Sequence, residues 1–190
     1  SILRPPRKKN KVRWYQETGG LQRRLKLAAK VAALLTELHS RGLLFGDLSP
    51  NNIFISEDPS CEEVWFIDAD NITYGTARDF LYTPRYGAPE IVRREQTADS
   101  LTDAWSLATV ICELLTTAHP FWAGNLVDNE DPEIFGDKAD SGELPWIFEA
   151  QDTSNQTSHG ISPEIVLSKK LFNLLRVCFE ESRRNRDARK

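Results

Sequence analysis

The sequence predicts a mainly helical α+β domain with a minor strand component, on three observations. Two long segments, about 21–40 and about 101–116, repeat apolar residues at the spacing of a helix. Three short stretches rich in β-branched and aromatic residues lie between them, separated by polar segments. The chain has 190 residues, of which 40% are hydrophobic and 27% charged, so one globular domain can bury a core without disulfide or metal staples.

The first long helix is expected over about 21–40. Gly19 and Gly20 precede it, and Gly42 follows it as a stop signal. One face of this helix is apolar and contains Leu21, Leu25, Ala28, Ala29, Ala32, Leu35 and Leu38. That face is expected to pack on the core of the domain.

The three strand-like stretches follow at 43–45, 53–56 and 64–67, and we expect them to form a small hairpin-like unit. The second long helix, over about 101–116, should be buried, because apolar side chains cover most of its circumference. These side chains are Trp105, Leu107, Val110, Ile111, Leu114 and Leu115.

The remainder of the chain is expected to consist of loops and a last helix. Residues 119–160 are rich in Pro, Gly, Asp and Asn, and aromatic residues should dock these loops on the core. A helix fits residues 168–180. His39 should be a structural residue at a helix end, and His119 and His159 should lie in loops, because no histidine has the spacing of a zinc site or a catalytic triad.

The formal charge of −4 conceals a strong partition. Residues 1–26 hold nine basic residues and one acidic residue, residues 27–182 hold ten basic and 26 acidic, and residues 183–190 hold five basic and one acidic. The first basic segment, with Trp14 and Tyr15 as stacking partners, would suit a nucleic acid. We favour a segment that packs on the acidic body of the chain itself, so nucleic acid is not the expected partner.

The three cysteines, Cys61, Cys112 and Cys178, have no C-x-x-C spacing, so neither a zinc site nor a redox pair is expected. No run approaches the roughly 20 apolar residues that span a bilayer, and no signal peptide is evident. These observations predict a cytoplasmic protein with no membrane partner. The chain begins at Ser1 and contains no methionine, which suggests a fragment or an omission of modified residues.

Asp47, Asn52 and Asp68 form the pattern that indicates chemistry. Each follows or adjoins one of the short strands, so the three side chains can converge on one cleft. Mg²⁺ prefers hard oxygen ligands and is usually held by one or two protein groups together with phosphate oxygens and water. A further carboxylate can orient an attacking hydroxyl and accept its proton. The trio therefore suits magnesium-dependent phosphoryl transfer.

Four motifs in order resemble protein kinases, most closely the bacterial relatives of eukaryotic Ser/Thr kinases. The stretch HSRGLLFGDLSPNNIFI resembles the catalytic loop H-R-D-L-x-x-x-N, and Asp68-Ala69-Asp70 stands where D-F-G is expected. The stretch YTPRYGAPE, which begins at Tyr82, resembles the end of an activation segment, and DAWSL, which begins at Asp103, resembles the opening of the buried helix that follows it. The resemblance covers roughly residues 20–190 and implies the C-terminal lobe of a kinase, with small hairpin strands around the catalytic loop.

The resemblance implies that Asp47 is the catalytic base and that Asn52 and Asp68 hold the magnesium ions that bridge the phosphates of ATP. Thr83 would line the substrate-docking loop and hydrogen-bond near Asp47. Asp70 adds a carboxylate that either assists the metal or lies in solvent. Protein Ser/Thr hydroxyls would be the acceptors.

Three further residues would have structural roles in the resemblance. Asp103 would cap the backbone of the catalytic loop from the buried helix. Glu90 would form a buried ion pair with an arginine near the end of the domain, and Arg189 fits that arginine best.

Several residues depart from the kinase pattern. Phe45 and Gly46 replace the usual His and Arg, so we expect an activation segment that does not depend on phosphorylation. Ser49 replaces a lysine beside the transferring group, and Ala69 replaces Phe of D-F-G. The G-D pair also resembles the H-G-D of aminoglycoside and choline phosphotransferases, but those families lack the A-P-E and D-x-W-S-L segments.

No G-x-G-x-x-G loop and no V-A-I-K strand precede the long helix. We therefore expect residues 1–20 to be a basic inter-lobe linker and residues 21–190 to be a C-lobe whose N-lobe partner is missing from this chain. Two functions follow as alternatives. One is an ATP- and Mg²⁺-dependent protein Ser/Thr kinase, of which this part alone would be inactive. The other is a pseudokinase or a partner-binding scaffold with weak or no phosphotransfer.

Overall fold

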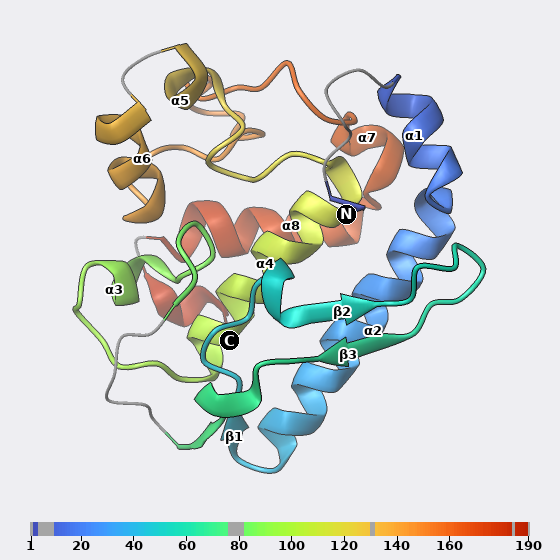
Figure 1. Cartoon of the computed structure of the whole chain (residues 1–190). Coiled ribbons are helices and arrows are strands. Elements are labelled where there is room, and N and C mark those ends of the chain that lie inside the picture. Colours follow the sequence, from blue (N-terminus) through green and yellow to red (C-terminus); the bar gives the residue numbers. More distant parts are fainter. Residues whose placement is uncertain (1, 4–9, 76–81, 130–131, 184, 190) are drawn as a thin grey trace.

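The computed structural model describes residues 2–3, 10–75, 82–129, 132–183 and 185–189. The helices are α1 (Lys11–Glu17), α2 (Gly20–Ser40), α3 (Pro89–Val92), α4 (Ser100–Thr116), α5 (Asn125–Asn129), α6 (Pro132–Asp140), α7 (Pro163–Val166) and α8 (Lys169–Arg176). The strands are β1 (Leu43–Leu44), β2 (Ile53–Ile55), β3 (Val64–Phe66) and β4 (Thr73–Tyr74). The fold is therefore mainly helical α+β, as predicted (Figure 1).

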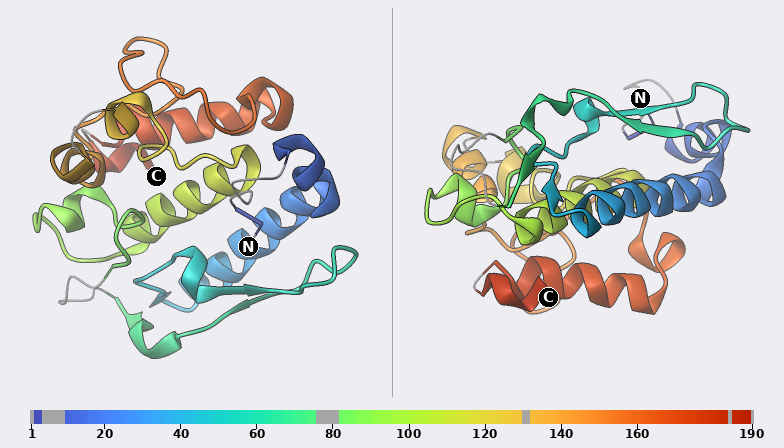
Figure 2. Two further views of the ribbon diagram at one scale, coloured as in Figure 1. Left: turned by 45° about the horizontal axis from the view of Figure 1, so that its top comes forward. Right: turned by 90° about the horizontal axis from the view of Figure 1, so that it is seen from below.

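The two long helices α2 and α4 form the middle layer of the molecule. Leu27 and Ala28 of α2 meet Leu114 of α4 in a buried apolar cluster. Figure 2 shows the β2–β3 hairpin on one side of this layer and α7 and α8 on the other. Helix α4 starts with a capping box in which Asp99 accepts from the backbone of Thr102 and the Thr102 hydroxyl interacts with the backbone of Asp99. Both long helices lie where the apolar periodicity predicted them.

The strands pair differently from the expected hairpin-like unit of three. β2 and β3 do form an antiparallel hairpin, in which Phe54 lies opposite Trp65. β1 instead pairs with β4, a strand that the sequence pattern did not predict. The chain leaves β1 at Gly46, whose φ of +81° is readily adopted only by glycine, and this turn separates β1 from the hairpin.

Helix α1 lies within the range expected to be a linker, and its aromatic residues are buried. Trp14 and Tyr15 are 4% and 6% exposed and belong to the main core cluster, so neither is available for stacking on a nucleic acid. The buried Arg24 of α2 lies 3.8 Å from the centre of the Tyr15 ring and donates hydrogen bonds to the carbonyl oxygens of Tyr15 and Gly20. Burial lowers the pKa of Arg24 to about 10. The basic residues at positions 4–9 lie outside the described part of the chain.

The segment after α4 is docked on the core by aromatic side chains, as expected. The ring of Phe121 stacks on that of Trp105 at 5.5 Å, and Phe179 meets both rings edge-on. The last predicted helix is α8, which continues as one π-helical turn, Val177–Glu181.

All three cysteines are free thiols, and burial raises the pKa of Cys112 to about 12. Within the described ranges, no helix has the length and apolar character that a bilayer span requires.

Candidate active site

The loop after β1 is tied to both long helices through Asp103. This carboxylate is buried near the start of α4, and it accepts from the backbone N–H of Phe45 at 2.8 Å and of Gly46 at 2.9 Å. Nε2 of His39, at the end of α2, lies 2.9 Å from the same carboxylate. Charge-assisted hydrogen bonds of this kind are about twice as strong as neutral ones. The loop that carries Asp47 is therefore held in place by Asp103 of α4, which also contacts α2.

We expect the substitution Asp103→Asn to lower the free energy of unfolding by about 2–3 kcal/mol, because an amide can accept from only part of this donor set. Denaturant unfolding followed by circular dichroism measures the change. The exposed Asp137 of α6 provides the control, since Asp137→Asn should alter stability by less than about 0.5 kcal/mol. Equal midpoints for the two variants would contradict the capping role of Asp103.

Asp47 is half-buried and lies at the centre of the candidate site. Its Oδ1 accepts from the backbone N–H of Thr83 at 2.5 Å. The side-chain Nδ2 of Asn52 donates to the carbonyl oxygen of Asp47 at 2.8 Å and to its Oδ2 at 3.1 Å. The structure thus brings together three of the residues that the sequence singled out.

Asp68 lies next to this group at the end of β3. The preceding residue, Ile67, donates its backbone N–H to the carbonyl oxygen of Asn52 at 3.0 Å, which places the two chain segments side by side. Asp68 is exposed and takes a left-handed backbone conformation with φ +56°, which Asp tolerates better than most residues. Asp70 is also exposed, in a single 3-10 turn, so its role as a metal ligand stays a prediction.

The side-chain oxygens of Asn52 and Asp68 are ligands of the kind that a magnesium ion prefers. Because Nδ2 of Asn52 is used toward Asp47, its Oδ1 is left as an acceptor, and no described residue donates to the Asp68 carboxylate. Within the described ranges no group of three or more His, Cys, Asp or Glu side chains could hold a metal. A site with only two protein groups matches Mg²⁺, which commonly takes its remaining ligands from phosphates and water.

Two of the residues that depart from the kinase pattern, Phe45 and Ser49, are buried, whereas Ala69 is exposed. The Ser49 side chain is fully buried and accepts a hydrogen bond from the Thr83 hydroxyl at 3.1 Å. Phe45 is 1% exposed, and its ring lies 4.7 Å from that of Phe66. At Gly46 a Cβ would lie 3.3 Å from the carbonyl oxygen of Asn71, in addition to the positive φ, so a larger residue would be strained there. The expected independence from phosphorylation concerns a segment that includes residues 76–81, which lie outside the described residues.

A cavity of about 520 Å³ opens beside the loop that follows Asp47. Its walls include Pro50 and Asn51 on one side and the segment from Thr83 to Tyr86 on the other.

A buried carboxylate on α4 also contacts this segment. Tyr86 donates its hydroxyl to the carboxylate of Glu113 at 2.5 Å. Sequence reasoning missed Glu113, because a lone acidic residue in an apolar helix carries no motif.

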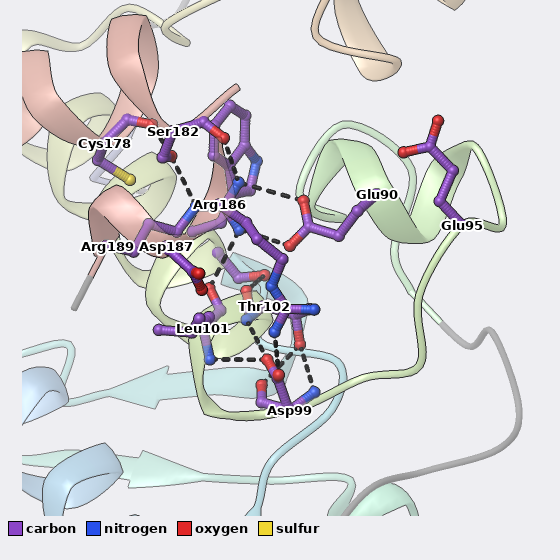
Figure 3. Close-up of polar contacts among 12 residues, drawn as sticks. Glu90, Glu95, Asp99, Leu101, Thr102, Cys178, Ser182, Arg186, Asp187 and Arg189 are labelled. Atoms are coloured by element: carbon purple, nitrogen blue, oxygen red, sulfur yellow. Dashed lines mark hydrogen bonds and ion pairs between the residues drawn. The ribbon is translucent and has the colours of Figure 1, made fainter. Parts of the chain in front are cut away.

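The end of the chain clamps α3 and the start of α4. Arg189 donates to Glu90 with two nitrogens, at 2.6 and 3.1 Å, and the guanidinium lies 4.7 Å from the centre of the Trp105 ring. Arg186 pairs with Asp99, the cap of α4. Figure 3 shows the two arginines side by side, with Glu90 beside them and Asp99 below. The Arg186 pair could have been suspected only from the capping motif at Asp99.

Comparisons with known proteins agree with this geometry. The rat serine/threonine-protein kinase Sgk1 is 34% identical over 106 residues, which is 55% of this chain and 24% of that protein. The human 3-phosphoinositide-dependent protein kinase 1 is 32% identical over 101 residues, and the Schizosaccharomyces pombe kinase sck2 is 32% identical over 110. These alignments cover 51% and 57% of this chain, and 18% and 17% of the two relatives. The chain therefore spans about a quarter or less of the length of these relatives.

A solved structure, the Cydia pomonella granulovirus kinase PK-1, superimposes with a TM-score of 0.58 at 20% identity. The match covers 89% of this chain and 57% of that one, and it shows a shared fold. The family model of the protein kinase domain matches residues 10–188, nearly the entire length. The chain belongs to the protein kinase domain family.

Proposed function

We propose that this chain is the catalytic part of an ATP-dependent protein kinase that phosphorylates Ser and Thr hydroxyls of protein substrates. The observation that carries the proposal is the arrangement around Asp47. Its carboxylate is oriented from two sides, by the N–H of Thr83 and by the amide of Asn52. A carboxylate fixed in this way can accept a proton from a hydroxyl placed against it.

Each residue of the site then has a defined task. Asp47 orients the acceptor hydroxyl and takes its proton. The free oxygens of Asn52 and Asp68 would hold Mg²⁺, and the backbone N–H of Thr83 links the substrate-docking segment to the Asp47 carboxylate. When bound, Mg²⁺ would neutralise the charge that develops on the transferring phosphoryl group.

An exposed apolar strip on the β2–β3 hairpin is an argument for a second lobe that packs there. Phe54 and Trp65, which lie opposite each other on the hairpin, are 53% and 45% exposed, and Ile67 at the end of β3 is 43% exposed. Apolar surface of this kind marks an interaction site when it is contiguous. We assign this strip to a nucleotide-covering N-lobe outside this chain, with residues 1–20 as the connection and residues 21–190 as the C-lobe. A bacterial source and a cytoplasmic location stay predictions from the sequence.

The alternative is a pseudokinase that binds partners without useful phosphotransfer. The observation in its favour is Ser49, a neutral residue hydrogen-bonded to Thr83 where kinases often have a lysine. The retained trio of Asp47, Asn52 and Asp68 favours the enzyme, because a scaffold has no physical need for all three.

Transfer of labelled phosphate from ATP to a generic protein substrate by the full-length protein tests the proposal. We expect transfer that EDTA abolishes and that excess Mg²⁺ restores. Asp68→Asn should raise the Mg²⁺ concentration needed for half-maximal rate at least about tenfold, since a charged ligand is lost. Residues 1–190 alone should turn over poorly. A full-length protein with no transfer, or transfer that is insensitive to EDTA, would reject the kinase assignment in favour of the scaffold.

A further inference from the structure

A tight turn lies directly beside the candidate base. The backbone N–H of Tyr86 donates to the carbonyl oxygen of Thr83 at 3.0 Å, Pro84 is the second residue, and Arg85 is the third with φ +78°. This is the pattern of a type II turn, whose third position favours glycine because its φ is positive. Arg85 therefore holds a strained conformation, which persists only where the surrounding structure enforces it.

The buried ring of His119 contacts the backbone of this turn. Its Nε2 lies 2.9 Å from the carbonyl oxygen of Arg85, and its Nδ1 accepts from the backbone N–H groups of Phe121 and Trp122, both at 3.2 Å. A carbonyl oxygen can only accept, so Nε2 carries the proton, and Nδ1 is the unprotonated nitrogen. Only the neutral Nε2–H tautomer makes all three hydrogen bonds.

The side chain of Arg85 is held by the same part of the chain. Its guanidinium lies 4.0 Å from the centre of the Trp122 ring. The indole N–H of Trp122 donates to the carboxylate of Asp140 at 2.6 Å, at the end of α6. Arg85 is therefore fixed at its carbonyl and at its side chain by residues that follow α4.

We propose that His119 is a positioning residue for phosphoryl transfer. In its Nε2–H form it holds the turn from Thr83 to Tyr86, and so keeps the N–H of Thr83 on the carboxylate of Asp47. The catalytic consequence rests on the proposed function, whereas the hold on the turn can be tested without any activity.

Two matched variants test the hydrogen bonds of the two ring nitrogens of His119 separately. In His119→Asn the amide oxygen takes the place of Nδ1 but nothing reaches the carbonyl of Arg85. In His119→Gln the amide nitrogen takes the place of Nε2, and the acceptor for the backbone of Phe121 and Trp122 is lost. Hydrogen exchange of single amides, measured by NMR, reads out both losses.

We expect a crossed pattern of exchange. His119→Asn should speed exchange at the amides of Thr83 and Tyr86 about tenfold, with Phe121 and Trp122 unchanged, and His119→Gln should do the reverse. The ring nitrogens of the parent protein should show a protonated Nε2 and an unprotonated Nδ1. A protonated Nδ1, or unchanged exchange at Thr83 and Tyr86 in His119→Asn, would overturn the proposal. The tautomer measurement uses the parent chain, so the test survives a variant that does not fold.

A rescue variant and kinetics connect the turn to the reaction. Arg85→Gly relieves the strain, because glycine adopts positive φ readily, so exchange at Tyr86 in the double variant with His119→Asn should return toward the parent rate. In the full-length protein, His119→Asn should lower kcat/KM for the protein substrate about tenfold and leave KM for ATP unchanged, while His119→Gln stays near the parent. Equal loss in both variants would contradict the positioning role. Crossed exchange without phosphoryl transfer would reject the proposed function and the catalytic role of His119, and would confirm only that His119 holds the turn.

Discussion

Replacing Asp47 by asparagine in the full-length protein is expected to reduce kcat for phosphoryl transfer by about 10²- to 10⁴-fold, the usual contribution of a positioned general base. Asparagine has nearly the same shape, and its Oδ1 can still accept from the N–H of Thr83. It has no basic oxygen to take the proton of the acceptor hydroxyl. One contact changes in the ground state, since Asn52 loses its 3.1 Å bond to Oδ2 but keeps the 2.8 Å bond to the carbonyl oxygen.

Asp47→Asn should therefore lower the rate of phosphoryl transfer and leave the fold intact. The free energy of unfolding should change by no more than about 1.5 kcal/mol, the typical value of one hydrogen bond. Asp58 offers a matched control, because among the described residues its exposed carboxylate accepts hydrogen bonds from Ser60 alone, within the loop between β2 and β3. Asp58→Asn should leave kcat unchanged. Parent-like kcat in the Asp47 variant would remove Asp47 from the chemistry and favour the scaffold alternative.

The parts of the fold that the sequence predicts well are those with strong local periodicity. α2 and α4 start and end within one residue of the expected positions, because their apolar residues repeat over several turns. Asp47, Asn52 and Thr83 could be singled out because they belong to motifs of fixed spacing. Their hydrogen bonds to one another then follow from the chain geometry of the loop and the turn.

The parts that the sequence could not predict depend on contacts between distant segments. Helix α1 has seven residues and little periodicity, and it is stabilised by packing of Trp14 and Tyr15 around the buried Arg24. A two-residue strand such as β4 has no pattern of its own and exists through its pairing with β1. The sequence indicates only a loop residue at His119. Its contact with the turn could not be predicted, because His119 and Arg85 are 34 positions apart in the sequence.

Removing one partner of the Glu90–Arg189 ion pair is expected to destabilise the fold by about 3–5 kcal/mol, because a buried charge is then left without compensation. The two side chains are 6% and 1% exposed and meet through two hydrogen bonds. Arg189 also donates to the hydroxyl of Ser182 at 2.7 Å. Its guanidinium therefore links Glu90 of α3 to the residue that follows the π-helical turn. The melting temperature should fall by about 10 °C in either Glu90→Ala or Arg189→Ala.

The double variant and an exposed pair supply the comparison. Glu90→Ala combined with Arg189→Ala should lose less than the sum of the single losses, since no unpaired charge remains. Glu37 and Arg41 form an ion pair on the surface of α2 with side chains 60% and 67% exposed, and Glu37→Ala should cost no more than about 0.5 kcal/mol. In the full-length protein, well below the melting temperature, kcat should remain close to the parent value. Among the described residues, neither Glu90 nor Arg189 forms a hydrogen bond with Asp47, Asn52 or Asp68. A Glu90→Ala protein that melts with the parent would show that this buried pair does not hold the lobe together.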